Sequence, residues 1–197
     1  MMTNDFMVPN FKPMINRAFG LEPIKVGDQM MLKLKGIGIF AATVHKIVGN
    51  KALIICNDCV DLRPMNADSI NEGGYENSDL KKWIDNDLFN AFPDCLKDRM
   101  SGLSIPSVGE IFGWDNEWYN QVFVKDEDER LSLMYMDEFV FGAFEGEPSC
   151  YWLRNSAKSP SYASRVNYNG YPDWSVKSDV YIGVRPEFWL EINQIDS

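Results

Sequence analysis

The stretch Tyr151–Ile192, YWLRNSAKSPSYASRVNYNGYPDWSVKSDVYIGVRPEFWLEI, organises the rest of the chain, because it joins two apolar ends through a polar middle. Its first end is Trp152–Arg154. Towards its second end, the even-numbered positions from Val180 onward are apolar, with Pro186 as the one interruption. This period of two predicts a half-buried strand, and Pro186 indicates an edge position or a bulge within it.

The middle of the stretch has the composition of a contact surface, since 15 of the 28 residues 155–182 are Asn, Ser, Tyr or Asp. Tyrosine offers large, stiff, amphipathic contact area, and Ser and Asn offer adaptable hydrogen bonds. A rigid frame that holds an adaptable loop is a common way to build a binding site. We expect a scaffold of Trp152, Arg154, Arg185 and Trp189, with Trp152 and Trp189 largely buried. The expected ligand-binding residues are Asn155, Ser156, Tyr162, Ser164, Asn167, Tyr168, Asn169, Tyr171, Asp173, Trp174, Ser175, Lys177, Asp179 and Tyr181.

The whole chain has the length and charge of an acidic globular protein. Its 197 residues suffice for one domain with its own core. The formal net charge of −10 argues against non-specific nucleic-acid binding, which requires Lys and Arg to neutralise phosphates. No apolar run approaches the roughly 18 residues that a membrane span needs. The N-terminus lacks the basic and apolar regions of a secretory signal, so we expect synthesis in a cytoplasm and reduced cysteines.

The first 23 residues are expected to be an N-terminal arm, followed by one ligand-binding domain over residues 24–197. The arm contains Phe6, Phe11 and Phe19 among other apolar residues without a clear period. So many apolar groups favour an arm that packs, either on its own domain or on a neighbouring subunit of a homo-oligomer.

Local patterns predict both strands and helices. Residues 26–59 are expected to be β structure, with a tight hairpin at Gly49-Asn50. The apolar run Ala52–Cys56 is typical of a central strand covered on both faces. Asn77-Ser78 can cap a helix whose apolar stripe is Leu80, Trp83, Ile84 and Leu88. Short helices are also expected near Pro93 and at the capping box Ser107–Glu110, and Trp114–Arg130 is expected to be a long insertion loop.

Candidate chemical centres are sparse. Cys56 and Cys59 have the spacing of a redox pair or half a zinc site, but no second pair completes it, and no helix start follows it. His45 is the single histidine, and no nucleophile or phosphate-loop motif accompanies it. The acidic run 126–129 lacks the EF-hand pattern. The sequence therefore predicts no catalytic residue, no metal site and no cofactor, and it favours a protein that is not an enzyme.

The frame residues resemble the signature of a bacterial and phage family whose members end in a WLRS…GVRPAxW pattern. The resemblance rests on Trp152–Arg154, Ala163, Val166, Gly170, Gly183–Pro186 and Phe188-Trp189. Upstream, Asn77–Leu80 with Trp83-Ile84 resembles the family's NSxLRxWL helix, and Ala52–Cys56 resembles its GxALLL strand. The resemblance covers roughly residues 26–192, and this chain departs from it at Asn155, often Ser, and Glu187, often Ala.

That resemblance implies an α+β, C-type-lectin-like domain, related to formylglycine-generating enzymes, with short antiparallel sheets, two or three helices and long loops. Several relatives are variable proteins of diversity-generating retroelements, in which a C-terminal repeat rich in Asn, Ser, Tyr and Asp changes while its frame stays fixed. The oxidase branch of the fold uses paired cysteines near its C-terminal end, where this chain has Cys150 alone.

We therefore expect a non-enzymatic, receptor-binding-like domain that recognises a protein or glycan on a cell surface. It would be made in a bacterial cytoplasm and could be carried on a phage virion. Two alternatives stay open: a structural virion or assembly protein that packs against copies of itself, and an enzyme of the formylglycine-generating-enzyme-like fold that uses His45, a cysteine or the acidic run.

Overall fold

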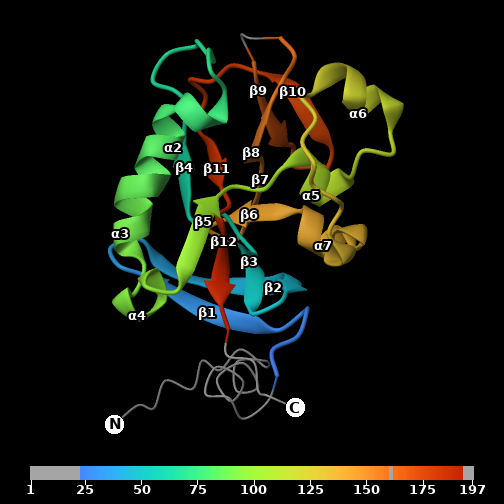
Figure 1. The fold of residues 1–197 in the computed structure, drawn as a ribbon. Helices are drawn as coiled ribbons and strands as arrows, with labels where there is room; N and C mark the ends of the chain where they lie inside the picture. The colour runs from blue at the N-terminus through green and yellow to red at the C-terminus, as the bar shows by residue number, and fades with distance from the viewer. Residues whose placement is uncertain (1–22, 160–161, 193–197) are drawn as a thin grey trace.

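Two five-stranded sheets and one hairpin form the centre of the protein (Figure 1). The computed structural model describes residues 23–159 and 162–192, so the expected arm lies outside the described residues except for Pro23. The first sheet has the order β1 (Gln29–Leu34), β2 (Gly38–Val48), β3 (Lys51–Cys56), β12 (Glu187–Glu191), β5 (Met100–Ser104). The second has the order β10 (Pro172–Val176), β9 (Ala163–Val166), β8 (Tyr151–Ser156), β11 (Ile182–Val184), β4 (Asp61–Arg63). The hairpin consists of β6 (Gly142–Phe144) and β7 (Glu147–Ser149). Neighbouring strands in these sheets pair antiparallel, except β8 and β11, which are parallel, and together with the helices the sheets make an α+β protein.

The apolar run of β3 forms a central strand, as the sequence predicts. β3 pairs with β2 on one side and with β12 on the other, and Gly49-Asn50 forms the hairpin turn before it. Its side chains alternate between two hydrophobic clusters: Ile54 contributes to one, and Leu53 and Ile55 contribute to the other. Both faces of the strand are therefore covered.

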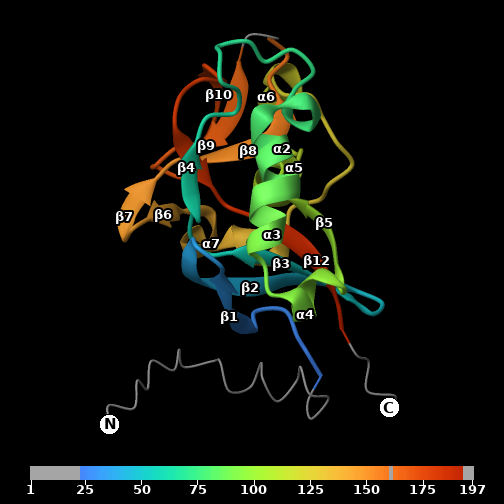
Figure 2. The ribbon, with the colours of Figure 1, turned by 90° about the vertical axis from the view of Figure 1, so that its left-hand side faces the viewer.

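Helices lie on both sides of the sheets (Figure 1). One side carries the short 3₁₀ turn η1 (Tyr75–Asn77), a continuous helical run, and α4 (Asp94–Lys97), which Figure 2 shows from the front. The run comprises α2 (Asp79–Trp83), the π-helical η2 (Ile84–Leu88) and α3 (Phe89–Ala91), and Ser78 caps it by accepting a hydrogen bond from the amide of Lys81. The other side carries α5 (Val108–Phe112), α6 (Glu117–Val122), η3 (Ser132–Tyr135) and α7 (Asp137–Val140). The capping box Ser107–Glu110 at the start of α5 is present.

The prediction of one strand across residues 180–192 was wrong, because the chain changes sheets there. β11 belongs to the second sheet and β12 to the first, and Arg185 and Pro186 connect them. Pro186 cannot donate a ladder hydrogen bond, but its carbonyl accepts one from the amide of Cys56 at 2.9 Å. The guanidinium of Arg185 fills the junction. The apolar period of two runs through this junction, and it therefore could not reveal the change of sheet.

Two segments have more regular structure than the sequence suggested. The polar middle, 155–181, contains the strands β9 and β10, and the presumed insertion loop, 114–130, contains α6. The Asn116 side chain caps α6 by accepting a hydrogen bond from the amide of Trp118. Short helices are therefore more numerous than the two or three expected. In the part of the chain that the structure describes, no helix has the length and apolar character needed to cross a membrane.

Candidate ligand-binding surface

Four tyrosines of the polar middle point into solvent. Their exposed fractions are 37% for Tyr162, 63% for Tyr168, 66% for Tyr171 and 70% for Tyr181. Each lies outside a strand, on the connections before β9, between β9 and β10, and before β11. The expected residues Asn169, Ser175, Lys177 and Asp179 are also exposed. The strands of this region bury their apolar residues, and the exposed tyrosines lie on the connections between strands.

Two half-buried residues from the expected ligand-binding residues, Asn167 and Asp173, fix the shape of the β9–β10 hairpin. The carbonyl oxygen of the Asn167 side chain accepts hydrogen bonds from the amides of Asn169 (2.9 Å) and Tyr171 (3.2 Å). Asp173 accepts two hydrogen bonds from the Arg165 guanidinium (3.0 and 2.8 Å). Partial burial raises the pKa of Asp173, but hydrogen bonds from Ser175 and Arg165 outweigh it and bring the pKa below its ordinary value. The turn that carries Tyr168 and Tyr171 is thus held by its own polar side chains.

Trp174 supports a neighbouring helix rather than the open surface. Its ring lies edge-on to Trp118, with ring centroids 4.3 Å apart, and it also contacts Phe123 at 6.4 Å. Both partners belong to the region of α6, so Trp174 fastens this helix to β10. Ser156 is half-buried as well, at the end of β8.

Two residues expected on the surface lie in the interior. Asn155 is 8% exposed and Ser164 is 0% exposed. The Asn155 side chain accepts a hydrogen bond from the amide of Val108 (2.6 Å) and donates to the Val124 carbonyl (3.0 Å) and the Asp126 carboxylate (2.8 Å). Asn155 therefore joins α5 to the segment after α6. Residues within a strand alternate between its two faces, and a count of polar residues cannot detect this alternation.

The exposed residues fall into two groups. In the first, the Tyr162 carbonyl accepts a hydrogen bond from Asn71 (3.0 Å), and the Ser178 hydroxyl donates to the Asp68 carbonyl (2.9 Å). The loop 64–74 thereby links the segments that carry Tyr162 and Tyr181. In the second, the turn with Tyr168 and Tyr171 lies against the exposed ring of Phe141, which a Cβ on Gly170 would approach to 3.1 Å. No local pattern in the sequence signals the contacts of Phe141 or of the 64–74 loop, because their partners lie far away along the chain.

The scaffold residues hold this region in place. Trp152 is fully buried and donates its indole hydrogen to the Arg63 carbonyl at 2.7 Å. Arg185 is also fully buried, and it donates to the carbonyls of Cys56 (2.7 Å) and Phe139 (2.8 Å). Arg154 binds the carboxylates of Glu110 and Asp128. Trp189 is partly buried and lines a cavity, so it is less enclosed than Trp152.

The side chains considered for redox or acid–base chemistry are buried and uncharged. Burial raises the pKa of the Cys56 thiol and of the Cys59 thiol to about 12. Burial, together with the nearby Arg185, lowers the pKa of His45 to about 3. Among the described residues, no three His, Cys, Asp or Glu side chains are grouped so as to hold a metal ion. Near neutral pH, Cys56 and Cys59 are therefore thiols and His45 is a neutral imidazole.

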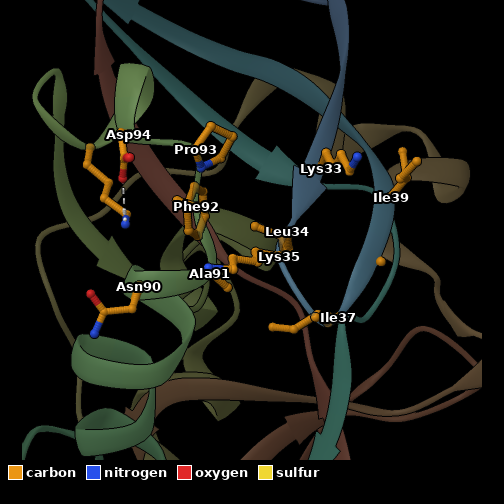
Figure 3. A pocket seen from close by; sticks show the side chains of 13 residues that line it. Lys33, Leu34, Lys35, Ile37, Ile39, Asn90, Ala91, Phe92, Pro93 and Asp94 are labelled. Atoms are coloured by element: carbon orange, nitrogen blue, oxygen red, sulfur yellow. Dashed lines mark hydrogen bonds and ion pairs between the residues drawn. The ribbon is translucent and has the colours of Figure 1, made fainter.

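A separate cleft of about 560 Å³ lies beside the edge strand β1 (Figure 3). Figure 3 shows Leu34, Lys35 and Ile37 on one side of it and Ala91 and Phe92 on the other. The amide of Lys35 donates a hydrogen bond to the Ala91 carbonyl at 2.7 Å, which ties the β1–β2 turn to the end of α3. Exposed lysines on an edge strand discourage pairing with another sheet, and this explains the basic character of the cleft.

The family described as a domain of unknown function (DUF6273) matches residues 49–192, and the chain belongs to this family. The match runs from the β2–β3 turn to the residue after β12, so it includes the scaffold and the exposed tyrosines. No curated protein and no solved structure matches the chain.

Proposed function

We propose that this member of the DUF6273 family is a non-enzymatic ligand-binding domain that uses its exposed tyrosines to bind a protein or glycan on a cell surface. The observation that carries the proposal is the separation within residues 151–192 of a buried scaffold from exposed tyrosines. Trp152 and Arg185 are fully buried, whereas Tyr168, Tyr171 and Tyr181 are each more than half exposed. Tyrosine anchors supply much of the binding energy in protein interfaces.

Two finer statements belong to the same proposal. The first is that the architecture is C-type-lectin-like, which two small sheets, short helices and a set of structured connections support. The second is that residues 155–181 are the variable segment of a diversity-generating retroelement target, carried on a virion or bacterial surface. Their polar, tyrosine-rich composition on a fixed frame supports it. A near-copy of the 151–190 coding sequence beside a reverse-transcriptase gene in the source genome is the expected finding, and a locus without either would contradict it.

The binding proposal is tested with a combined variant in which Tyr162, Tyr168, Tyr171 and Tyr181 are changed to Ser. Labelled wild type and variant are applied to a glycan array and to a panel of whole bacterial cells. We expect the variant to lose binding, because removing a contact anchor costs about 2 kcal/mol or more of binding free energy. Each exposed substitution should change stability by about 0.5 kcal/mol or less.

A matched control changes four other exposed apolar residues to Ser: Ile39, Val48, Tyr135 and Met136. It should retain binding, because these residues lie outside the polar middle. Equal loss of binding in both variants would contradict the tyrosine surface. Unfolding of the tyrosine variant alone would show that these rings are structural, and an assembly protein would then be the better description.

A further inference from the structure

A second candidate site, independent of the tyrosine surface, is a cavity of about 390 Å³ lined by residues of β5, α5, β8 and β12. Leu103, Leu131 and the half-buried Trp189 supply its apolar lining. Its polar lining is charged and gathers around Arg154, which comes from β8.

One guanidinium nitrogen of Arg154, Nη1, has more hydrogen-bond acceptors around it than it has hydrogens. Its Nη2 donates to the Asp128 carboxylate at 2.6 Å. Its Nη1 donates to the Ile105 carbonyl at 2.7 Å and to the Glu187 carboxylate, and it also lies 2.9 Å from Oε2 of Glu110. A guanidinium Nη carries two hydrogens, so three acceptors compete for the two hydrogens of Nη1. One cation therefore serves three carboxylates.

The rest of the lining does not offset this excess. Five carboxylates line the cavity, namely Glu76, Glu110, Asp128, Glu129 and Glu187, against the three cations Lys46, Lys81 and Arg154. Lys81 is already paired with Asp85, which is not part of the lining. The lining thus carries more negative than positive groups, and a concave site with such an excess attracts cations.

Glu187 shows where a ligand would be held. Glu187 is 4% exposed, and its Oε2 has no hydrogen-bond partner among the described residues. Burial first, and then the charge of Glu110, raises the pKa of Glu187 well above its ordinary value. Both causes favour the neutral, protonated form of the carboxyl group. A buried acceptor without a partner is costly, and a donor from a ligand would relieve that cost.

We propose that this cavity binds an organic cation, a primary ammonium or a guanidinium, with its charge at Glu187 and Glu110 and its carbon chain against Trp189 and Leu103. A cationic group is attracted to the face of an indole ring as well as to carboxylates. A metal ion fits less well, because no group of three ligating side chains in the described residues is arranged to hold one. A bound cation stabilises the ionised form of Glu187, so binding strengthens as pH rises through the pKa of Glu187 and releases a proton in that pH range.

The test is a titration of the full chain with n-butylammonium chloride, monitored by the NMR signal of the Trp189 indole N–H, which a Trp189→Phe variant assigns. The neutral n-butanol is the comparison probe. We expect the ammonium to shift the Trp189 signal saturably and butanol not to. Calorimetry in two buffers of different ionisation enthalpy, repeated at several pH values, should show proton release on binding at pH values around the pKa of Glu187. A blocked lysine, Nα-acetyl-lysine methylamide, is the second ligand arm: tighter binding than butylammonium identifies a protein side chain as the occupant, and weaker binding identifies a free amine.

Glu187→Gln keeps the shape of the side chain and removes its charge, so it should weaken butylammonium binding by about tenfold or more and abolish the proton release. Glu138→Gln, on the exposed face of α7, is the matched control and should leave both unchanged. If Glu187→Gln does not fold, Asp128→Asn replaces it as the test variant. Asp128 accepts a hydrogen bond from Nη2 of Arg154, and weaker binding is expected. Absence of a saturable shift, an equal shift with butanol, or equal binding by the Glu187 and Glu138 variants would overturn the proposal.

Discussion

Arg154, which is partly buried, and Arg185, which is fully buried, belong to the same stretch of chain, but only Arg154 is surrounded by carboxylates. Arg154 contacts the carboxylates of Glu110, Asp128 and Glu187. Arg185 donates only to neutral oxygens, those of Cys56, Phe139 and Tyr151, and its Nη2 has no hydrogen-bond partner among the described residues.

The two environments shift the pKa values of neighbouring groups in opposite directions. Near Arg154, burial and the charge of Glu110 raise the pKa of Glu187, which favours its protonated form. Near Arg185, burial and the positive charge lower the pKa of His45 to about 3, which favours its neutral form. A buried guanidinium does not by itself determine the function of its site. The number of opposing charges around it does, and an excess of them leaves capacity to bind a cation.

The largest effect is expected for Arg154→Met. It strands three carboxylates in or beside a cavity, and loss of one partner of a buried charged group costs about 3–5 kcal/mol. Urea denaturation measures the change in the free energy of unfolding. Arg165→Met is the matched control, because the Arg165 side chain is about as exposed as that of Arg154 (25% against 21%) but pairs, among the described residues, with the single carboxylate of Asp173, so a smaller loss is expected. Equal losses in the two variants would show that Arg154 is not the centre of an ionic cluster.

The pH dependence of stability separates the two regions. The folded pKa of His45, about 3, lies below its ordinary value of 6.5, so protons bind preferentially to the unfolded chain. Stability contributed by neutral His45 is present above pH 6.5 and falls as pH decreases towards 3. At pH 4.5 the loss reaches about 2.7 kcal/mol, from 1.36 kcal/mol per pH unit. Glu187 has the opposite sign: its pKa is raised, so its contribution is lost as pH rises through the folded value.

A His45→Phe variant isolates the contribution of His45 to the loss of stability at acid pH. Phenylalanine is similar in size and can keep the edge-on contact that His45 makes with Phe139 at 5.5 Å. Denaturation of wild type and variant at several pH values between 8 and 4.5 gives the difference in slope, with about 2.7 kcal/mol expected over this interval. Parallel curves would mean that His45 titrates normally in the folded protein, and Arg185 would then not shape its environment.

Local signals in the sequence predict the parts of the fold that local interactions form. The cap at Ser78, the capping box at Ser107 and the hairpin at Gly49-Asn50 all depend on residues within four positions of each other, and all are confirmed. The central strand Ala52–Cys56 was predictable because both of its faces are apolar.

Distant contacts determine the rest, and the sequence does not display them. The partners of Arg154, Glu110 and Asp128, lie 44 and 26 positions away, on elements whose docking no periodicity reveals. The same limit explains why Asn155 was expected on the surface. Its hydrogen bonds go to the Val108 amide and the Asp126 carboxylate, at separations of 47 and 29 positions. A polar side chain that is satisfied by distant groups looks, in the sequence, like one that is free to bind a ligand.

Arg185→Met should cost less than Arg154→Met. It removes a cation that has no carboxylate partner among the described residues, and it leaves the carbonyls of Cys56 and Phe139 without this donor. Unsatisfied buried acceptors cost about 1–3 kcal/mol each, and removal of the uncompensated charge offsets part of this, so we expect a net loss of about 2 kcal/mol. The pKa of His45 should also rise in this variant, which the chemical shift of its imidazole protons measures against pH. A loss as large as that of Arg154→Met would erase the distinction between the two arginines.

The smallest effect is expected for Glu110→Gln, and it tests the carboxylate excess most directly. Glutamine can still accept the hydrogen bond that the amide of Ser107 donates to Glu110 at 2.9 Å, so the capping box survives. The contact with Arg154 loses its charge, but the repulsion between Glu110 and Glu187 disappears with it, and Asp128 and Glu187 still neutralise the guanidinium. These changes oppose each other, so the free energy of unfolding should change by less than about 1 kcal/mol. The pKa of Glu187 should fall, because the charge that raises it is gone, and a carbon-detected NMR titration of the Glu187 carboxyl would measure it. If Glu110→Gln were as destabilising as Arg154→Met, every carboxylate around Arg154 would be needed to neutralise it, and no excess would remain to bind a cation.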